Sequence, residues 1–392
     1  MYLTQVELID FRNYEHGSLE FAPGPNLLIG ANGQGKTNIV EAIAYLATLT
    51  SHRVSSDAPL IRLGATQAVV RARVVAGLAD ARVLTLEIEV NPGRANRARL
   101  NRVPQRRARD LMGALRAVLF TPDDLAIVKG DPAERRGAVD DVVVQRWPRL
   151  VGVKADYDRV VRQRNALLKG VSNRGGRLDP ETAANLDIWG EQLAVLGAEL
   201  MLARAQTIAD MRPHLARAYE AIAPTNNAIE VAYRPHVAAL RESLSDEPWP
   251  SAPEAAAALQ QALIERREDE VRRGVSLVGP HRDEIEMRIG PLPAKGYASH
   301  GESWSLALSW RLAGFELLRG EGSEPVLLLD DVFAELDPVR RERLASAISD
   351  AEQTVITAAD EQDVPPDLRG RRFAVKAGTV SAETDTVTAE TE

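Results

Sequence analysis

Residues 30–37 read Gly30-Ala31-Asn32-Gly33-Gln34-Gly35-Lys36-Thr37, and this stretch decides the fold. Its spacing matches the G-x-x-x-x-G-K-[ST] pattern, in which glycines let backbone N–H groups turn toward phosphate groups. A short apolar run at 26–29 precedes it, and apolar periodicity predicts a helix over about 36–49 after it. The helix N-terminus adds positive potential, Lys36 would reach the β- and γ-phosphates, and Thr37 would ligate Mg²⁺. We therefore predict that all eight residues bind a nucleotide, the alternative being a chance glycine-rich turn.

Two carboxylates, Asp330 and Asp331, end the apolar run that begins at Val326. In a phosphate-loop enzyme the first would complete the Mg²⁺ shell, and the second would polarise the attacking water. We predict catalytic roles for both, together with Lys36; a core strand that ends in two solvated acids is the alternative. The gap from Lys36 is 330 − 36 = 294 residues, which predicts a long insertion between two halves of one site. The chain has no N-K-x-D sequence, which argues against a guanine-nucleotide enzyme.

A second anion site is predicted at Ser299-His300-Gly301-Glu302, before a helix expected over about 301–319. A serine hydroxyl, a glycine N–H and a helix N-terminus together suit a phosphate group. A serine that only caps the helix is the alternative. The place of this stretch, shortly before the strand that ends at Asp330, favours the phosphate site.

Together these motifs resemble the ABC-type heads of the SMC-like ATPases, and in particular the bacterial RecF family of recombination-repair ATPases. The segments that carry the resemblance are FRNY at 11–14, GANGQGKTNIVEAI at 30–43, SHR at 51–53, FTPDDL at 120–125, GPHRD at 279–283 and DDVFAELD at 330–337. The resemblance implies an α/β fold, an ABC-type P-loop ATPase head with an inserted, mostly helical domain. It also implies ATP and Mg²⁺ as cofactors, and a weak ATPase activity that DNA stimulates.

The same resemblance implies a cycle on DNA. ATP binding would join two copies into a homodimer on single-stranded, duplex or gapped DNA, and slow hydrolysis would release it. The dimer would help to load the RecA recombinase at single-strand gaps and stalled forks, with RecR and RecO as partners. In such a dimer Ser299 and Gly301 would contact the γ-phosphate held by the second protomer, and Asp337 would communicate across the interface.

Other residue roles are implied less directly by the family pattern. Arg12 and Asn13 would contact the nucleotide, and a capped strand end is the alternative. The glutamine of a Q-loop cannot be placed, and Asp123 or Asp124 stands in its region. Thr357 stands where a switch histidine is usual in ABC-type heads.

Motif positions and composition divide the chain into three parts. Domain I is expected to comprise residues 1–121 and 275–380, and the helical domain II residues 122–274. Residues 381–392 are expected to form a disordered acidic tail, because acids predominate and bases are absent.

Local patterns add four expectations. Alternating apolar residues over 67–103 predict an antiparallel meander, and the segment 228–235 predicts a strand. A long helix is predicted from Pro180 to about 223, with a break at Pro213 because proline lacks the backbone N–H.

Composition excludes several classes of protein. The 392 residues include no cysteine, so disulfides and thiolate catalysis are ruled out. The N-terminus lacks the basic start and apolar core of a signal peptide, and the longest apolar run is far too short to cross a bilayer. We therefore expect a cytoplasmic protein without a membrane partner.

Local charge patterns predict where DNA would bind, although the net charge is −8. Residues 94–116 hold eight arginines against one acid, and residues 154–177 hold seven bases against two acids. The predicted contacts are Arg97, Arg99, Arg106 and Arg107. They would bind phosphates without sequence preference, the alternative being solvated surfaces. His281 and Arg282 could also meet DNA or phosphate, or form a structural turn.

Two other functions compete with a repair ATPase. An ABC transporter nucleotide-binding subunit would need a membrane partner and more closely spaced motifs. A nucleotide-gated scaffold would hydrolyse ATP only incidentally, so turnover that DNA stimulates would argue against it.

Overall fold

The computed structural model describes residues 1–223, 228–244 and 248–383. Its contacts divide the chain into two compact units. Unit 1 comprises Met1–Leu125, His214–Asn226 and His300–Glu392, and unit 2 comprises Ala126–Pro213 and Asn227–Ser299. The sequence predicts boundaries at 122 and 274, whereas this division assigns residues 275–299 to the helical unit. The expected boundaries remain a proposal.

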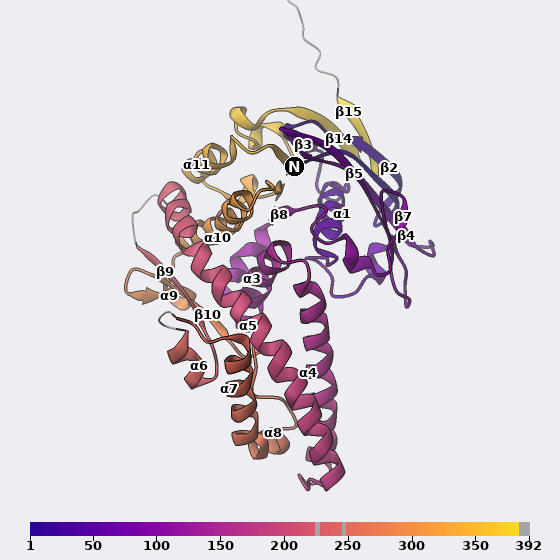
Figure 1. Cartoon of the computed structure of the whole chain (residues 1–392). Coiled ribbons are helices and arrows are strands. Elements are labelled where there is room, and N and C mark those ends of the chain that lie inside the picture. The colour runs from indigo at the N-terminus through magenta and orange to yellow at the C-terminus, as the bar shows by residue number, and fades with distance from the viewer. Residues whose placement is uncertain (224–227, 245–247, 384–392) are drawn as a thin grey trace, which may run out of the picture. The chain divides into compact units, whose positions relative to one another are not determined.

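Unit 1 contains a six-stranded antiparallel sheet in the order β2-β1-β4-β5-β6-β7 (Figure 1). Its strands are Tyr2–Phe11 (β1), Tyr14–Glu20 (β2), Ala68–Gly77 (β4), Asp80–Val90 (β5), Arg97–Leu100 (β6) and Val103–Pro104 (β7). The meander predicted over 67–103 is confirmed. Strand β2 was not predicted, because YEHGSLE contains only one aliphatic side chain, that of Leu19.

The second sheet of unit 1 is mostly parallel, in the order β15-β14-β3-β13-β12-β8. Its strands are Gly24–Ile29 (β3), Ala117–Phe120 (β8), Val326–Asp330 (β12), Gln353–Ala358 (β13), Arg371–Lys376 (β14) and Thr379–Glu383 (β15). Strands β3, β13 and β12 are parallel neighbours, so their carboxyl ends lie at one edge of the sheet. This topology brings residues 30–37 and 330–331 together across the long insertion.

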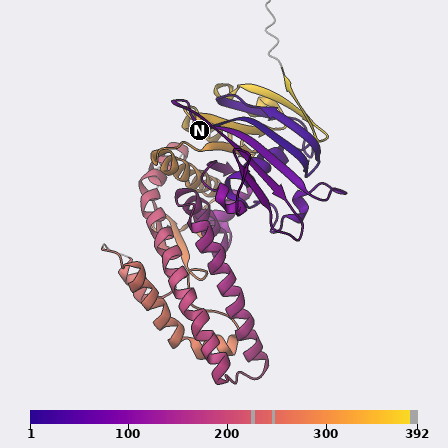
Figure 2. The same cartoon turned by 45° about the vertical axis from the view of Figure 1, so that its right-hand side comes forward.

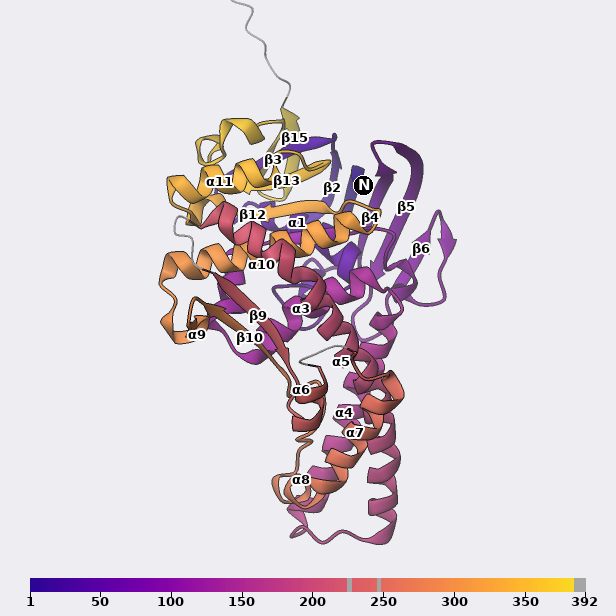
Figure 3. The same cartoon turned by 60° about the vertical axis from the view of Figure 1, so that its left-hand side comes forward.

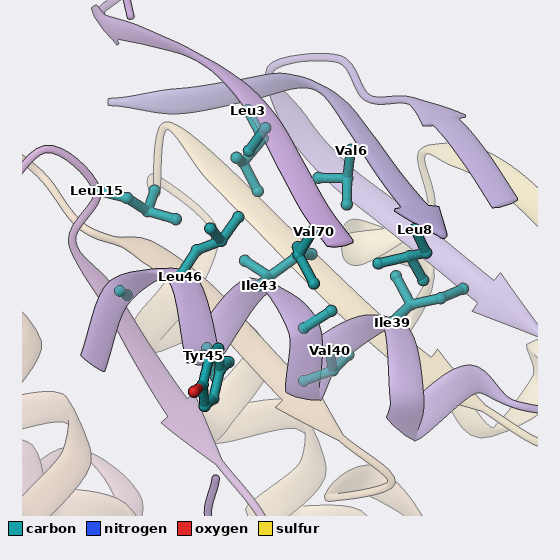
Figure 4. Close-up of a cluster of buried hydrophobic side chains, with 14 of the residues drawn as sticks. Leu3, Val6, Leu8, Ile39, Val40, Ile43, Tyr45, Leu46, Val70 and Leu115 are labelled. Atoms are coloured by element: carbon teal, nitrogen blue, oxygen red, sulfur yellow. The ribbon is translucent and has the colours of Figure 1, made fainter. Parts of the chain in front are cut away.

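Helix α1 (Lys36–Thr48) packs against strands of both sheets. Its apolar residues recur at helical spacing, and Ile39, Ile43 and Leu46 are buried. Figure 4 shows these side chains beside Leu3 and Val70 of the antiparallel sheet. Because this core fixes α1, it also fixes the loop that leads into the helix. The other long helices of unit 1 are His300–Gly320 (α10) and Pro338–Ile348 (α11).

Unit 2 is mostly helical, and Figure 2 shows α4 and α5 lying side by side and antiparallel. The helices between residues 125 and 297 are Leu125–Lys129 (α2), Pro132–Arg146 (α3), Leu150–Asn173 (α4), Pro180–Ile222 (α5), Ala238–Ser243 (α6), Ala252–Glu265 (α7), Arg267–Arg273 (α8) and Ala294–Tyr297 (α9). A small antiparallel sheet, Ile229–Arg234 (β9), Glu284–Ile289 (β10) and Leu292–Pro293 (β11), packs on α3 (Figure 3). Within the described residues, none of the helices combines the length and apolar character needed to cross a bilayer.

Buried ion pairs connect neighbouring helices of unit 2. The Arg204 guanidinium donates to both carboxylate oxygens of Asp140 at 2.7 and 2.8 Å, and to the carbonyl of Pro280. Arg164 and Glu270 form a second pair, which is almost completely buried. Such pairs constrain geometry more than they add stability, because desolvation offsets much of their attraction.

Two expectations about local structure were wrong. Helix α5 does not break at Pro213, because its buried face continues through Met211, Leu215 and Tyr219 and packing holds the helix together. The acidic tail was expected from residue 381, but residues 381–383 belong to β15, which pairs with β14. The remainder of that tail, 384–392, lies outside the described residues.

Candidate nucleotide site

The loop at 30–37 surrounds a buried cation. The Lys36 ammonium donates to the carbonyl oxygens of Gly30 at 2.6 Å and Ala31 at 3.3 Å, and to Asn32 Oδ1 at 3.4 Å. Lys36 is only 2% exposed, yet it has no acidic partner in the described part of the chain. Burying a cation beside neutral groups alone is costly, so the site fits a polyphosphate anion. Gly33 and Gly35 have positive φ angles, which glycine adopts with little strain.

Residues of the FRNY segment, at the turn from β1 to β2 of the antiparallel sheet, donate hydrogen bonds to this loop. Asn13 Nδ2 donates to the carbonyl of Gln34 at 3.0 Å, and the Tyr14 hydroxyl donates to the carbonyl of Gly35 at 3.1 Å. A Cβ atom at Gly35 would lie 2.8 Å from the Asn13 amide and the Tyr14 hydroxyl, so the contact needs glycine. Asn13 thus contacts the loop itself, and its predicted contact with the nucleotide remains a proposal. Tyr14 is a site residue to which the sequence motifs gave no role.

The turn between β14 and β15 binds the same loop beside Asn13. The backbone N–H of Gly378 donates to the Gln34 carbonyl at 3.0 Å, and that of Ala377 donates to Gln34 Oε1 at 2.7 Å. Gly378 has φ +75°, and a Cβ atom there would overlap the Asn13 carbonyl. Sequence reasoning did not find this contact, and its only signal was a glycine in a turn that carries no recognised motif.

Arg12 is directed to a buried acid instead of to the loop. Its guanidinium makes a two-pronged ion pair with Glu41, whose side chain is fully buried on α1. The Ser51 hydroxyl donates to Glu41 at 2.6 Å, and Arg53 approaches it at 3.3 Å. Burial acts to raise the pKa of Glu41, but the bonds from Arg12 and Ser51 and the charge of Arg53 lower it overall. A nucleotide contact by Arg12 remains a proposal. The contacts of Ser51 and Arg53 with Glu41 give the SHR segment a structural role.

The two predicted metal ligands contact each other. Thr37 Oγ1 donates to Asp330 Oδ1 at 3.0 Å, and Thr357 Oγ1 donates to the same oxygen at 2.8 Å. Burial raises the pKa of Asp330 to about 6; the bond from Thr357 opposes this shift, and the charge of Asp331 adds to it. A hydroxyl and a carboxylate side by side are oxygen ligands of the kind that Mg²⁺ binds next to a phosphate group. The donor set therefore fits the predicted metal.

Thr357 also contacts Asp331. The backbone N–H of Asp331 donates to Thr357 Oγ1 at 2.8 Å, and the Asp331 carboxylate lies 3.2 Å from that oxygen. Asp331 has φ +52°, a conformation that few residues other than glycine adopt. One threonine hydroxyl thus lies between the two carboxylates. It belongs to Thr357, which stands where a switch histidine is usual in ABC-type heads.

The residues near the expected Q-loop have mainly structural contacts. Asp124 is buried and accepts two bonds from Arg311 of α10 at 2.8 and 3.1 Å, and one from the backbone of Thr121. Burial lowers the pKa of His52, whereas the charge of Glu41 and, to a smaller degree, those of Asp124 and Asp123 act to raise it. The ion pair between Asp124 and Arg311 gives this turn a structural role.

The Ser299–Glu302 stretch opens α10 and lies against α11. Asp337 caps α11 by accepting the backbone N–H of Arg340 at 3.1 Å, and it forms an ion pair with the Arg340 side chain. Arg340 Nε donates to Ser305 Oγ at 3.0 Å, and the guanidinium lies directly over Gly301. The structure thus links Gly301 and Asp337 within one protomer, through Arg340.

The predicted DNA contacts divide into two pairs. Arg97 and Arg99 lie on β6 opposite Glu89 and Glu87 of β5, and each forms an ion pair with its neighbour. Arg106 and Arg107 are exposed and follow β7.

The GPHRD turn is packed inside unit 2. His281 Nδ1 lies 2.6 Å from the Tyr157 hydroxyl, and its Nε2 lies 3.3 Å from the Ser276 carbonyl. Burial lowers the pKa of His281 to about 4. Arg282 also donates to the Ser276 carbonyl, at 2.7 Å. These contacts favour the structural turn over a phosphate contact.

Comparisons with known sequences identify the family. A family model described as RecF/RecN/SMC N terminal domain matches residues 2–365. The chain is 54% identical over 388 residues to the DNA replication and repair protein RecF of Cutibacterium acnes, covering 97% of this chain and 98% of that protein. It is 51% identical over 387 residues to the protein of the same name from Streptomyces avermitilis, covering 97% and 99%.

Comparisons with solved structures agree. The recombination mediator protein RecF of the RecFOR pathway, described as RecF-ATPrS, superposes with a TM-score of 0.86 at 26% identity and covers 98% of both chains. An Smc head bound to the C-winged helix domain of ScpA has a TM-score of 0.53 at 17% identity, again over 98% of both chains, and this likeness shows the fold alone. The fold is therefore the SMC-like head of ABC type, and the chain belongs to the RecF family.

Proposed function

We propose that this protein is an ATP-dependent DNA replication and repair protein that binds ATP and Mg²⁺ at residues 30–37 and Asp330. The observation that carries the proposal is the buried Lys36 ammonium, which has neutral partners only among the described residues, beside the contact between Thr37 and Asp330. The names of the curated relatives, and the ATPrS in the description of the similar structure, support it. A transporter subunit receives no such support.

Each residue of the site would have a separable task. Lys36 would exchange its bonds to loop carbonyls for bonds to phosphate oxygens, and the loop N–H groups would bind the same anion. Thr37 and Asp330 would hold Mg²⁺, which supplies neutralisation of charge on the phosphate oxygens. Asp331 would accept a proton from the attacking water and orient it.

The bridge through Thr357 suggests why hydrolysis would be slow. A threonine hydroxyl has one proton, and the shorter bond directs it to Asp330 instead of Asp331. Many ABC-type heads have glutamate at the position of Asp331, and its side chain is one methylene longer. Asp331 is also fixed by its backbone bond, so its carboxylate would reach the water less closely. Slow turnover suits a protein that must stay on DNA while partners arrive.

ATP would join two copies, with Ser299, Gly301 and Asp337 of one protomer facing the nucleotide of the other. A symmetric dimer of this kind would place each nucleotide at the interface, so hydrolysis in either site would weaken the dimer. Loading of RecA at single-strand gaps and stalled forks, with RecR and RecO as partners, is proposed from the family. The similar structure is described as belonging to the RecFOR pathway.

DNA would bind through exposed arginines, and those that form no ion pair would contribute most. Arg106 and Arg107 are exposed and form no ion pair within the described chain, whereas Glu89 and Glu87 partly neutralise Arg97 and Arg99. We retain all four as proposed contacts and expect the first two to contribute more.

A second basic surface lies in unit 2. Lys169, Arg174 and Arg177 are exposed at the turn between α4 and α5, without ion-pair partners among the described residues. Arg273 of α8 belongs to the same surface, because Gly274 packs on Lys169. We propose this surface as the next candidate for contact with phosphates.

The proposal is tested by binding to single-stranded, duplex and gapped DNA, with ATP, with ADP and without nucleotide, over a series of salt concentrations. Tighter binding with ATP, lost in the Lys36→Ala variant, is expected. Equal DNA affinity with ATP, with ADP and without nucleotide would refute an ATP-dependent cycle. ATP hydrolysis measured with and without DNA distinguishes the enzyme from a scaffold, since only the enzyme should turn over faster on DNA.

A further inference from the structure

Arg340 of α11 is held over the first turn of α10 by two partners. Its Nη1 forms an ion pair with Asp337, and its Nε donates to Ser305 Oγ at 3.0 Å. The third nitrogen, Nη2, donates to no group within the described part of the chain, and it lies 2.5 Å from the position that a Cβ atom at Gly301 would take. The guanidinium is therefore held in place with its Nη2 amino group, which carries two N–H bonds, unpaired beside Gly301.

This arrangement places a cation at the positive end of a helix. The N-terminus of α10 carries a partial positive charge, so a guanidinium beside it is unfavourable unless an anion is near. Arg340 pairs with Asp337, and the first turn of α10 also contains Glu302. Asp337 is 43% exposed, so solvent screens its pair with Arg340 and leaves the positive potential only partly cancelled.

A buried hydroxyl beside the same cluster is unsatisfied. Tyr219, from the last turns of α5, is 2% exposed, and its hydroxyl has no hydrogen-bond partner among the described residues. Burial raises the pKa of Tyr219; the charge of Glu302 adds to this shift, and the charge of Arg340 opposes it. A buried polar atom without a partner is rare, and it marks a place where a further ligand atom or a rearrangement is expected.

We propose that Arg340 completes the anion site at Gly301, and that its free Nη2 binds a phosphate oxygen of the nucleotide held by a second copy of this chain. Gly301 is then required for two reasons, because its N–H faces the phosphate and its missing side chain leaves room for the guanidinium. Asp337 acts by positioning Arg340. The inference rests on the proposed ATP-dependent dimer and adds a residue that the phosphate motifs do not include.

The test compares the ATP-dependent dimerisation of five proteins by light scattering over a series of protein concentrations, with ATP and Mg²⁺. They are the wild type, Ser299→Arg, Arg340→Ala, Arg340→Lys and, as a matched control on the same helix, Arg341→Ala. A charge-assisted hydrogen bond lost at one site weakens binding by roughly tenfold. The symmetric dimer has two such sites, so Arg340→Ala should raise the dimer dissociation constant about a hundredfold.

Binding of ATP to the monomer distinguishes this role from a structural one. Arg340→Ala should bind ATP like the wild type, Arg340→Lys should dimerise to an intermediate degree, and Arg341→Ala should dimerise normally. Wild-type dimerisation of Arg340→Ala, with loss in Ser299→Arg, would overturn this inference and leave the proposed function intact. A wild-type protein that stays monomeric with ATP would overturn the proposed dimer itself.

A further variant covers the case in which Arg340→Ala does not fold. Gly301→Ala keeps the arginine but puts a methyl group 2.5 Å from Nη2, which is too close, so it should displace the guanidinium and weaken the dimer. Normal dimerisation of both Gly301→Ala and Arg340→Lys would refute the assignment.

Discussion

Thr37 Oγ1 lies 3.0 Å from Asp330 Oδ1, although 293 residues separate the two along the chain. Parallel pairing of β3, β13 and β12 produces this contact, because it brings the ends of the strands to one edge. The inserted chain can therefore vary in length without altering the site, provided that the two strands keep their places in the sheet.

Lys36→Ala should weaken ATP binding about tenfold to a hundredfold, because a charge-assisted bond to phosphate contributes about 1.5–3 kcal/mol. Calorimetric titration with ATP measures the effect. Lys169→Ala, an exposed lysine in unit 2, is the control and should bind ATP normally. The thermal midpoint of Lys36→Ala should not fall, because the substitution removes a buried cation that lacks an acidic partner. Unchanged ATP affinity would refute the assignment of residues 30–37.

Asp331→Asn should bind ATP and dimerise, but hydrolyse ATP at least tens of times more slowly, because a general base contributes about 10²–10⁴-fold. The amide keeps the size of the side chain and removes the charge that accepts the proton. The dimer should then persist on gapped DNA with ATP and dissociate with ADP. Normal hydrolysis, or failure to dimerise, would place Asp331 in the metal shell or the fold.

Glu41→Gln should lower the free energy of unfolding by about 3 kcal/mol, because it leaves the guanidinium of Arg12 beside a neutral group in a buried place. Denaturant unfolding measures it, and Glu15→Gln, whose side chain is 83% exposed, is the control.

The same pair predicts a dependence on pH. The pKa of Glu41 is lowered in the folded protein from its ordinary value of 4.5. Its contribution is therefore present above that value, and it is lost as the pH falls through the folded value. Glu41→Gln should unfold with a flatter pH dependence in this acidic range, and an identical dependence in both proteins would contradict the proposed role of the pair.

Replacing Arg106 and Arg107 by alanine should weaken binding to every DNA sequence and reduce the slope of log K against log salt by about 1.8, if each contacts one duplex phosphate. Replacing Arg97 and Arg99 should change the slope less, since Glu89 and Glu87 already neutralise part of their charge. An unchanged slope in the variant that lacks all four would move the DNA surface to Lys169, Arg174 and Arg177.

The sequence predicted those parts of the site that local pattern determines. Lys36, Thr37 and Asp330 stand in motifs with strict spacing, and the strands and helix beside them have clear apolar periods. The ion pairs of Arg97 and Arg99 could not be predicted in this way, because they depend on the register between β5 and β6.

Other contacts join distant segments that carry no motif. Gln34 meets Ala377 across a separation of 343 residues, and Arg12 meets Glu41 through the packing of α1 on the sheet. Pro213 is the opposite case. The local rule that proline interrupts a helix predicted a break there, but tertiary packing keeps α5 continuous.

The hydrogen bonds from Ala377 and Gly378 to Gln34 have a practical consequence for truncated versions of this protein. The recognised motifs end at Asp337, so a shortened chain that stops near residue 370 would retain every one of them. It would nevertheless lose β14, β15 and the turn that steadies the phosphate loop from one side. Deletion of the last two strands is thus expected to impair ATP affinity as surely as a mutation inside the loop.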